Sequence, residues 1–149
     1  MTDKFELISI GTIHNKTDKI WLEIFDEFIP AMLNLEHFSH IITLWWISGM
    51  DTKENRKNLQ GHPRVKLDVN IQTPLSGIFT TRSPRRPNPI GLTIVKILKI
   101  EGNKIYIAHH DAFDYTPLID IKPYIPNSDS IQNVKLPEWF ESLKEKREE

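Results

Sequence analysis

The sequence predicts a mainly β protein: a single small β-barrel of short, mostly antiparallel strands, with one or two short helices and a C-terminal helix. The chain has 149 residues, of which 39% are hydrophobic, and this length suits one domain with one core. Many short segments alternate apolar and polar residues as half-buried strands do, whereas helical patterns are few. Closing such strands into a barrel removes exposed sheet edges.

The first two strands are expected at residues 5–14 and 20–25, where apolar and polar residues alternate. The short polar stretch between them predicts a hairpin loop. Residues 28–35 place apolar side chains at helical spacing with Pro30 near the start, which favours a short helix. Residues 40–47 are almost wholly apolar, which predicts a core strand covered on both faces.

The second half of the chain continues the β pattern. Residues 51–64 are hydrophilic and end in Gly-His-Pro, which indicates a surface connection with room for one helical turn. Further strands are expected at residues 65–71, 77–80, 90–100, 104–109 and 118–121, with a hairpin turn at residues 101–103. Residues 136–147 carry apolar side chains on one helical face and predict the C-terminal helix. The barrel core is therefore expected at residues 5–130 of one domain, 1–149.

Composition limits the classes of function. The chain has no cysteine, which excludes disulfides, cysteine-ligated zinc and thiol nucleophiles. No apolar run approaches the roughly 20 residues that span a bilayer, so we expect a cytoplasmic protein that does not bind membranes. Net charge is −5 over residues 1–52, +8 over residues 53–104 and −4 over residues 105–149. This basic middle suits a face that meets phosphates, although a merely solvated lysine-rich face would look the same.

Residues 77–92 form the most unusual stretch of the sequence. Three prolines within six residues stiffen a loop that displays Arg82, Arg85, Arg86 and Asn88. Arginine can grip a carboxylate or phosphate with two parallel hydrogen bonds, and an asparagine amide can read an adenine edge. The loop is either a binding element or a stiff turn with solvated arginines.

The histidines do not predict a metal site. His37 and His40 lie three residues apart, and His109 precedes His110, but the chain has no cysteine and no helical His-Glu-x-x-His pattern. We interpret these histidines as hydrogen-bonded residues at strand ends and expect no bound metal.

Two ordered motifs carry a family resemblance. Residues 81–84 read Thr-Arg-Ser-Pro and residues 86–92 read Arg-Pro-Asn-Pro-Ile-Gly-Leu. Residues 114–126 read Asp-Tyr-Thr-Pro-Leu-Ile-Asp-Ile-Lys-Pro-Tyr-Ile-Pro, with Asp-Ser at 129–130. From about residue 8 to residue 130, the sequence resembles the TsaA/TrmO-like family.

The resemblance implies a function. It implies a homodimeric β-barrel that binds S-adenosyl-L-methionine (SAM) and methylates N6 of threonylcarbamoyl-adenosine near the anticodon of tRNA. It places the cofactor between the loop at residues 82–92 and the turn at residues 114–117. The implied cofactor residues are Thr81, Arg82, Arg86, Pro87, Asn88, Ile90, Gly91, Asp114, Tyr115, Thr116 and Pro117. Contacts to tRNA are expected from Arg82, Arg85 and Lys122.

Three residues of the second motif are candidates for catalysis. Either Asp114 or Asp120 could pair with the sulfonium or withdraw the proton from the target nitrogen. Alternatively, Asp114 caps a turn and Asp120 forms an ion pair with Lys122 or an arginine. Tyr124 could stack on a base, or it could belong to the core or its rim.

The sequence departs from the family pattern at three places. Only residues 15–19 separate the first strands, where family members commonly have a longer loop ending in a Pro-Arg-Gln element. Ser48 stands where a histidine is frequent, and Tyr115 stands in place of glycine. Tyrosine there either adopts a positive φ at a cost or narrows the cofactor pocket. These departures favour the alternative function, a non-catalytic module that binds SAM or a nucleotide as a sensor or RNA-binding regulator.

Overall fold

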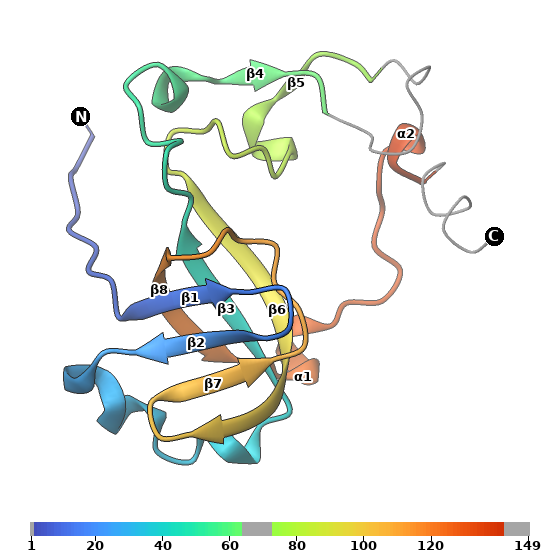
Figure 1. Cartoon of the computed structure of the whole chain (residues 1–149). Coiled ribbons are helices and arrows are strands. Elements are labelled where there is room, and N and C mark those ends of the chain that lie inside the picture. Colours follow the sequence, from blue (N-terminus) through green and yellow to red (C-terminus); the bar gives the residue numbers. More distant parts are fainter. Residues whose placement is uncertain (1, 64–72, 142–149) are drawn as a thin grey trace.

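Six antiparallel strands close into a barrel in the computed structural model, which describes residues 2–63 and 73–141 (Figure 1). The strands are β1 (Gly11–Asn15), β2 (Ile20–Ile24), β3 (His40–Trp46), β6 (Ile90–Glu101), β7 (Lys104–Ile107) and β8 (Thr116–Pro123). Their order around the barrel is β1-β2-β7-β6-β3-β8, and every pairing is antiparallel. The prediction of a mainly β fold is confirmed.

The core fills the inside of this barrel. Because successive side chains of a strand point to opposite faces, each strand contributes every second residue to the interior. The buried apolar residues are Ile13, Leu22, Ile24, Ile41, Trp45, Val95, Ile105, Ile107, Ala112 and Leu118. A barrel wall has a single inner face, and β3 accordingly buries only alternate residues. The expectation that both faces of this strand are covered is wrong.

Several predicted elements differ in extent. Residues 5–10 are not a strand, because β2 ends at Ile24 opposite Gly11, and the backbone hydrogen bonds of Ile10 to Leu118 and Phe25 are not continued toward residue 5 in the described part of the chain. The predicted helix at residues 28–35 is replaced by two 3₁₀ helices, Asp26–Met32, which contains Pro30, and Leu35–His37. The hydrophilic connection does contain one helical turn, Asn55–Lys57.

The predicted strand at residues 77–80 is mostly a turn. Only β5 (Ser76–Gly77) pairs, with β4 (Gln60–Gly61), and a 3₁₀ turn at Ile78–Thr80 follows because the Thr81 N–H donates back to the Ile78 carbonyl. The predicted strand at residues 65–71 lies outside the described residues.

The C-terminal part of the described chain is less regular than the barrel. The short helix α1 (Pro126–Asp129) follows β8, and α2 (Glu138–Glu141) lies within the predicted C-terminal helix. The rest of that predicted helix lies outside the described residues. Within residues 2–63 and 73–141, no helix is long and apolar enough to cross a membrane.

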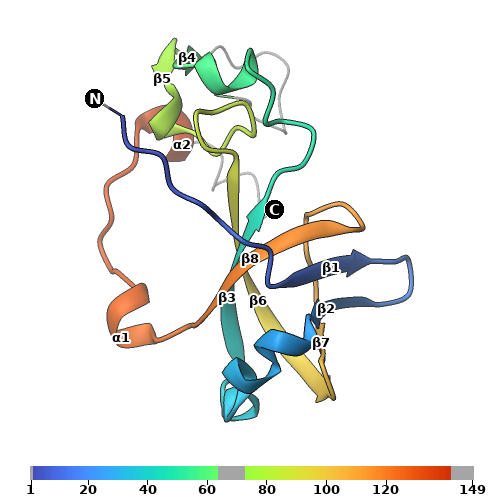
Figure 2. The same ribbon diagram turned by 90° about the vertical axis from the view of Figure 1, so that its left-hand side faces the viewer.

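The small β4–β5 sheet lies beyond one end of the barrel. Figures 1 and 2 both show the loop that connects β5 to β6 between this sheet and the barrel. The proline-rich segment found in the sequence is therefore held over the barrel end where β3 ends and β6 begins, and there the Ile47 N–H donates to the Pro89 carbonyl (2.8 Å). At this end of the barrel the fold brings together residues of the two sequence motifs.

Gly91 is required by the close approach of a tryptophan. It pairs directly with Trp45 across β3 and β6, and a Cβ at this position would overlap the Trp45 indole ring. We expect Gly91→Ala to lower the free energy of unfolding by about 1–3 kcal/mol, because the buried ring must move to make room. Urea denaturation would measure the loss, with Gly61→Ala as the control, since no atom lies within 4 Å of the Cβ position there. Equal stability of the two variants would contradict this account of Gly91.

Candidate functional site

A cavity of about 540 Å³ opens at the barrel end that faces the β4–β5 sheet. Three parts of the chain form it: the loop before β6 with the start of that strand, the loop between β7 and β8, and the end of β3. The predicted cofactor residues that line it are Thr81, Arg82, Arg86, Ile90, Gly91, Asp114, Tyr115 and Thr116. Pro87, Asn88 and Pro117 do not line it. Both sequence motifs thus contribute to one concave site.

The arginines of the proline-rich loop have different surroundings. Arg86 holds the loop together, because one of its guanidinium nitrogens donates to the backbone carbonyls of Thr81 (2.8 Å) and Ser83 (3.3 Å). Arg82 also lines the cavity, yet it forms no hydrogen bond or ion pair with any part of the chain that the structure describes. Arg82 is therefore available to an anionic ligand, whereas Arg86 is engaged by backbone.

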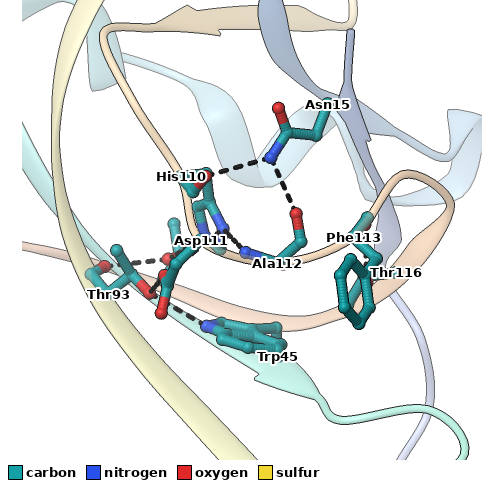
Figure 3. A network of polar contacts seen from close by, with 9 residues as sticks. Asn15, Trp45, Thr93, His110, Asp111, Ala112, Phe113 and Thr116 are labelled. Atoms are coloured by element: carbon teal, nitrogen blue, oxygen red, sulfur yellow. Dashed lines mark hydrogen bonds and ion pairs between the residues drawn. The ribbon is translucent and has the colours of Figure 1, made fainter. Parts of the chain in front are cut away.

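Asn15 fixes the second loop from the end of β1. Its side-chain amide donates to the carbonyls of His110 (3.0 Å) and Ala112 (2.7 Å) (Figure 3). Its backbone N–H donates to Asp114 Oδ1 (3.0 Å). The loop at residues 110–114 is consequently anchored to the barrel along its length. Such anchoring pre-orders the cavity wall before any ligand arrives.

His110 is a buried, neutral histidine behind this wall. The Ala112 N–H donates to Nδ1 (3.0 Å), so the ring proton lies on Nε2 and is donated to Thr43 Oγ1 (3.0 Å). The Thr43 hydroxyl in turn donates a hydrogen bond to the Thr93 carbonyl (2.8 Å). Burial is the main cause that lowers the pKa of His110 to about 4, and nearby Asp111 opposes this effect. The hydrogen bonds of His110 and its burial therefore both favour the neutral imidazole.

Asp111 presents a carboxylate to the cavity. The Trp45 indole N–H donates to Thr93 Oγ1 (3.1 Å), whose hydroxyl donates to Asp111 Oδ1 (2.7 Å) (Figure 3). The Asp111 side chain is 73% exposed, and its second oxygen has no hydrogen bond within the described part of the chain. These two hydrogen bonds orient Asp111 and leave its second carboxylate oxygen available to a ligand.

Asp114, in contrast, is already engaged. Its carboxylate accepts hydrogen bonds from the Lys16 ammonium and the Asn15 N–H, and His14 Nδ1 lies 3.7 Å away. The hydrogen bond from Lys16 is the main cause that holds the pKa of Asp114 below its usual range. Asp114 therefore joins the β1–β2 hairpin to the cavity wall, through contacts with Asn15 and Lys16 that differ from both the catalytic and the turn-capping prediction.

Tyr115 has both features expected of a tyrosine at a glycine position. Its φ is +66°, in the left-handed region that favours glycine, and its ring lines the cavity. Tyr115 therefore adopts a strained backbone conformation, and its ring also narrows the mouth of the cavity.

The structure does not bring the other candidates to this cavity. Asp120 forms an ion pair with Lys122 (2.9 Å), as in the alternative interpretation, and lines a separate apolar cavity. Tyr124 lies edge-on to His40, at the opposite end of β3 from the cavity. Arg85 is exposed and does not line the cavity.

Sequence reasoning missed several residues of the site. The sequence patterns assign none of Trp45, Thr93, His110 and Asp111 to the site. Their only sequence signal is the position of Asp111, three residues before Asp114, because the contacts join strands far apart in the chain. Among the described residues, no group of three or more His, Asp or Glu could hold a metal ion.

Comparisons with known proteins place the chain among methyltransferase-related proteins. Residues 8–130 match the family described as tRNA-methyltransferase O N-terminal domain. A probable S-adenosyl-L-methionine-binding protein of Methanocaldococcus jannaschii is 46% identical over 79% of this chain and 90% of its own length. The mouse tRNA (adenine(37)-N6)-methyltransferase is 40% identical over 79% of this chain but only 26% of its own length.

A solved structure supports the same fold. The TrmO structure from Pseudomonas aeruginosa superposes with a TM-score of 0.64, at 23% identity, over 89% of this chain and 62% of that one. At this identity the likeness concerns the fold alone. The chain spans less than two thirds of this structure and about a quarter of the mouse enzyme.

Proposed function

The chain belongs to the family of the tRNA-methyltransferase O N-terminal domain, and on that premise we propose that it is a SAM-dependent methyltransferase acting on N6 of threonylcarbamoyl-adenosine near the tRNA anticodon. The observation that carries the proposal is the single cavity that the proline-rich loop and the 111–116 loop line together. Its relatives named as SAM-binding proteins and tRNA methyltransferases supply the cofactor and the class of substrate.

The cavity suits SAM in size and in chemistry. Its volume of about 540 Å³ lies within the usual range for small-molecule sites. Ile90, Leu92 and the Trp45 indole offer apolar walls, and Arg82, which has no partner in the described part of the chain, offers a cation for the methionine carboxylate. We assign Arg82 to that carboxylate, and Arg86 to shaping the loop around it.

The bound sulfonium would supply a methyl group that is open to in-line displacement by the target nitrogen. Such a transfer needs positioning and exclusion of water more than acid strength. The free oxygen of Asp111 is placed to accept the N6 proton as the nitrogen–carbon bond forms. Asp114 would act through the loop, by holding Tyr115 and Thr116 against the β1–β2 hairpin. We assign no chemistry to Asp120 or Tyr124.

Calorimetry with SAM, followed by methyl transfer to tRNA that lacks this methyl group, tests the proposal. We expect a one-site binding heat and incorporation of a methyl group into the anticodon-loop nucleoside. Absence of SAM binding would overturn the cofactor assignment. Transfer to adenosine without the threonylcarbamoyl group, at equal efficiency, would overturn the substrate.

A second candidate function is a SAM-binding module without catalysis. It is favoured by the position of Asp120 and Tyr124 away from the cavity and by Ser48 at the place of a frequent histidine. The same experiment separates the two, because heat without methyl transfer would support the sensor.

We further propose that residues 1–149 form one cytoplasmic domain that works as a homodimer. The outer faces of β3 and β6 support the dimer, since Ile42, Leu44 and Trp46 lie beside Ile94, Leu92 and Ile90 on the barrel surface. Ile90 and Leu92 also line the cavity, so the proposed interface borders the proposed active site. Apolar patches of this kind mark protein interfaces.

The dimer can be tested at a residue outside the cavity. Ile94→Glu places a charge within the proposed interface and is expected to raise the dimer dissociation constant at least about 10-fold. Light scattering after size exclusion would measure the mass, with Leu59→Glu, an exposed leucine before β4, as the control. A monomeric wild-type protein, or a dimer unaffected by Ile94→Glu, would contradict the proposed face.

A further inference from the structure

Two aromatic rings stand exposed at the cavity mouth. Phe113 is 86% exposed and Tyr115 is 69% exposed, although both line the cavity. A tight turn presents them, because the Thr116 N–H and hydroxyl both donate to the Phe113 carbonyl (3.3 and 2.7 Å). The two rings therefore project from the rim of the proposed active site.

Glycine would fit the backbone conformation of this turn better than Tyr115 does. Tyr115 has a φ of +66°, which glycine adopts without strain and a ring-bearing residue does not. Leaving two large apolar side chains in water adds no stability to the fold. The strained backbone of Tyr115 and the exposure of both rings at the rim of the cavity point to a ligand that contacts the rings.

The surroundings of the rings favour an RNA ligand. The Lys16 ammonium, which is bonded to Asp114, lies 5.0 Å from the centre of the Tyr115 ring, and the His14 ring meets the Tyr115 ring edge-on at 5.3 Å. Arg82 lines the same cavity without a partner among the described residues. Aromatic faces beside cationic groups are how proteins bind unpaired nucleotides, with rings stacking on bases and cations facing phosphates.

We propose that Phe113 and Tyr115 hold an unstacked nucleobase of the substrate RNA at the cavity mouth by stacking. This inference rests on the proposed function and specifies how the target nucleotide is retained. Adenine occurs in both the cofactor and the RNA, and the rim position and exposure of the rings assign them to the RNA base.

A double-mutant cycle between rings and base tests the inference. Tyr115→Gly removes a ring and relieves the backbone strain, and Phe113→Leu keeps an apolar side chain without the ring. Each variant is titrated with an anticodon stem-loop RNA that carries either the target adenosine or an abasic site. We expect wild-type protein to bind the intact RNA about 10-fold more tightly than the abasic RNA, and each variant to lose most of that preference. Phe5→Leu, which changes an 85% exposed ring outside the cavity, should keep it.

The other outcomes overturn the inference. Equal loss of affinity for intact and abasic RNA would show that the rings do not touch the base. A fall in SAM affinity by calorimetry with unchanged RNA binding would assign them to the cofactor, and dissociation of a dimer with unchanged RNA binding would assign them to a second copy of the chain. Failure of the proposed function is separate, because wild-type protein would then bind no SAM or transfer no methyl group whatever the cycle shows.

Discussion

Arg82→Ala is expected to weaken SAM binding by about 10- to 100-fold, which is the value of a paired, charge-assisted hydrogen bond to a carboxylate. The expectation follows from the contrast between two arginines of one loop. Arg86 donates to the backbone carbonyls of Thr81 and Ser83, whereas Arg82 has no partner among the described residues. Because Arg82 supports no other contact there, its loss should leave the stability of the protein near that of the wild type.

Calorimetry with SAM measures this effect. Two further variants of arginines in the same loop serve as controls. Arg85→Ala removes an equal charge from an exposed position outside the cavity and should change SAM affinity little. Arg82→Lys keeps the charge without the planar fork and should fall between alanine and the wild type. Equal effects of Arg82→Ala and Arg85→Ala would indicate a general charge effect and would remove Arg82 from the cofactor site.

Protonation of His110 is expected to remove about 3 kcal/mol of unfolding free energy between pH 6.5 and pH 4. The ring binds a proton with a pKa of 6.5 in the unfolded chain and of about 4 in the folded protein. Above pH 6.5 both states hold it neutral, and stability does not change. As the pH falls below 6.5, His110 binds a proton in the unfolded state but not in the folded state. The free energy of unfolding therefore decreases until the pH reaches about 4.

Urea denaturation across this range would reveal the effect as a difference between two proteins. His110→Gln can accept from the Ala112 N–H or donate to Thr43, but it cannot titrate. The wild type should lose stability with falling pH more steeply than this variant, by about 1.4 kcal/mol per pH unit at most. The comparison concerns slopes, so a lower stability of the variant at neutral pH does not affect it. Parallel curves would contradict a buried, neutral His110.

The linear patterns of the sequence predicted the elements that depend on local contacts. Alternation located β2, a nearly continuous apolar run located β3, and the Glu-Gly-Asn turn located the hairpin between β6 and β7, where Gly102 has a φ of +59°. Alternation misled at residues 5–10, since a periodic segment becomes a strand only where another strand lies beside it. It misled again at residues 78–80, which follow a paired strand of only two residues and turn instead.

The two motifs likewise predicted which loops form the candidate site, but not the roles of residues within it. Asp114 and Asp120 were indistinguishable in the sequence as carboxylates flanking Thr-Pro. In the structure only Asp114 lines the cavity, because residues 116–123 form a strand that carries Asp120 away from the barrel end. The one sequence signal of Asp111 is its position three residues before Asp114, and this did not reveal its role, since its orientation depends on Thr93 and Trp45 of two other strands.

The sequence by itself determined the mainly β class, the family and the two loops to examine, because each is written in consecutive residues or in a period of two. Only the tertiary structure decided that Arg86 is engaged by backbone carbonyls while Arg82 has no partner within residues 2–63 and 73–141, that one Asp111 oxygen accepts no hydrogen bond from those residues, and that His110 is neutral. These properties depend on which atoms surround a group and how much water reaches it. Barrel closure sets both by joining residues that are tens of positions apart in the chain.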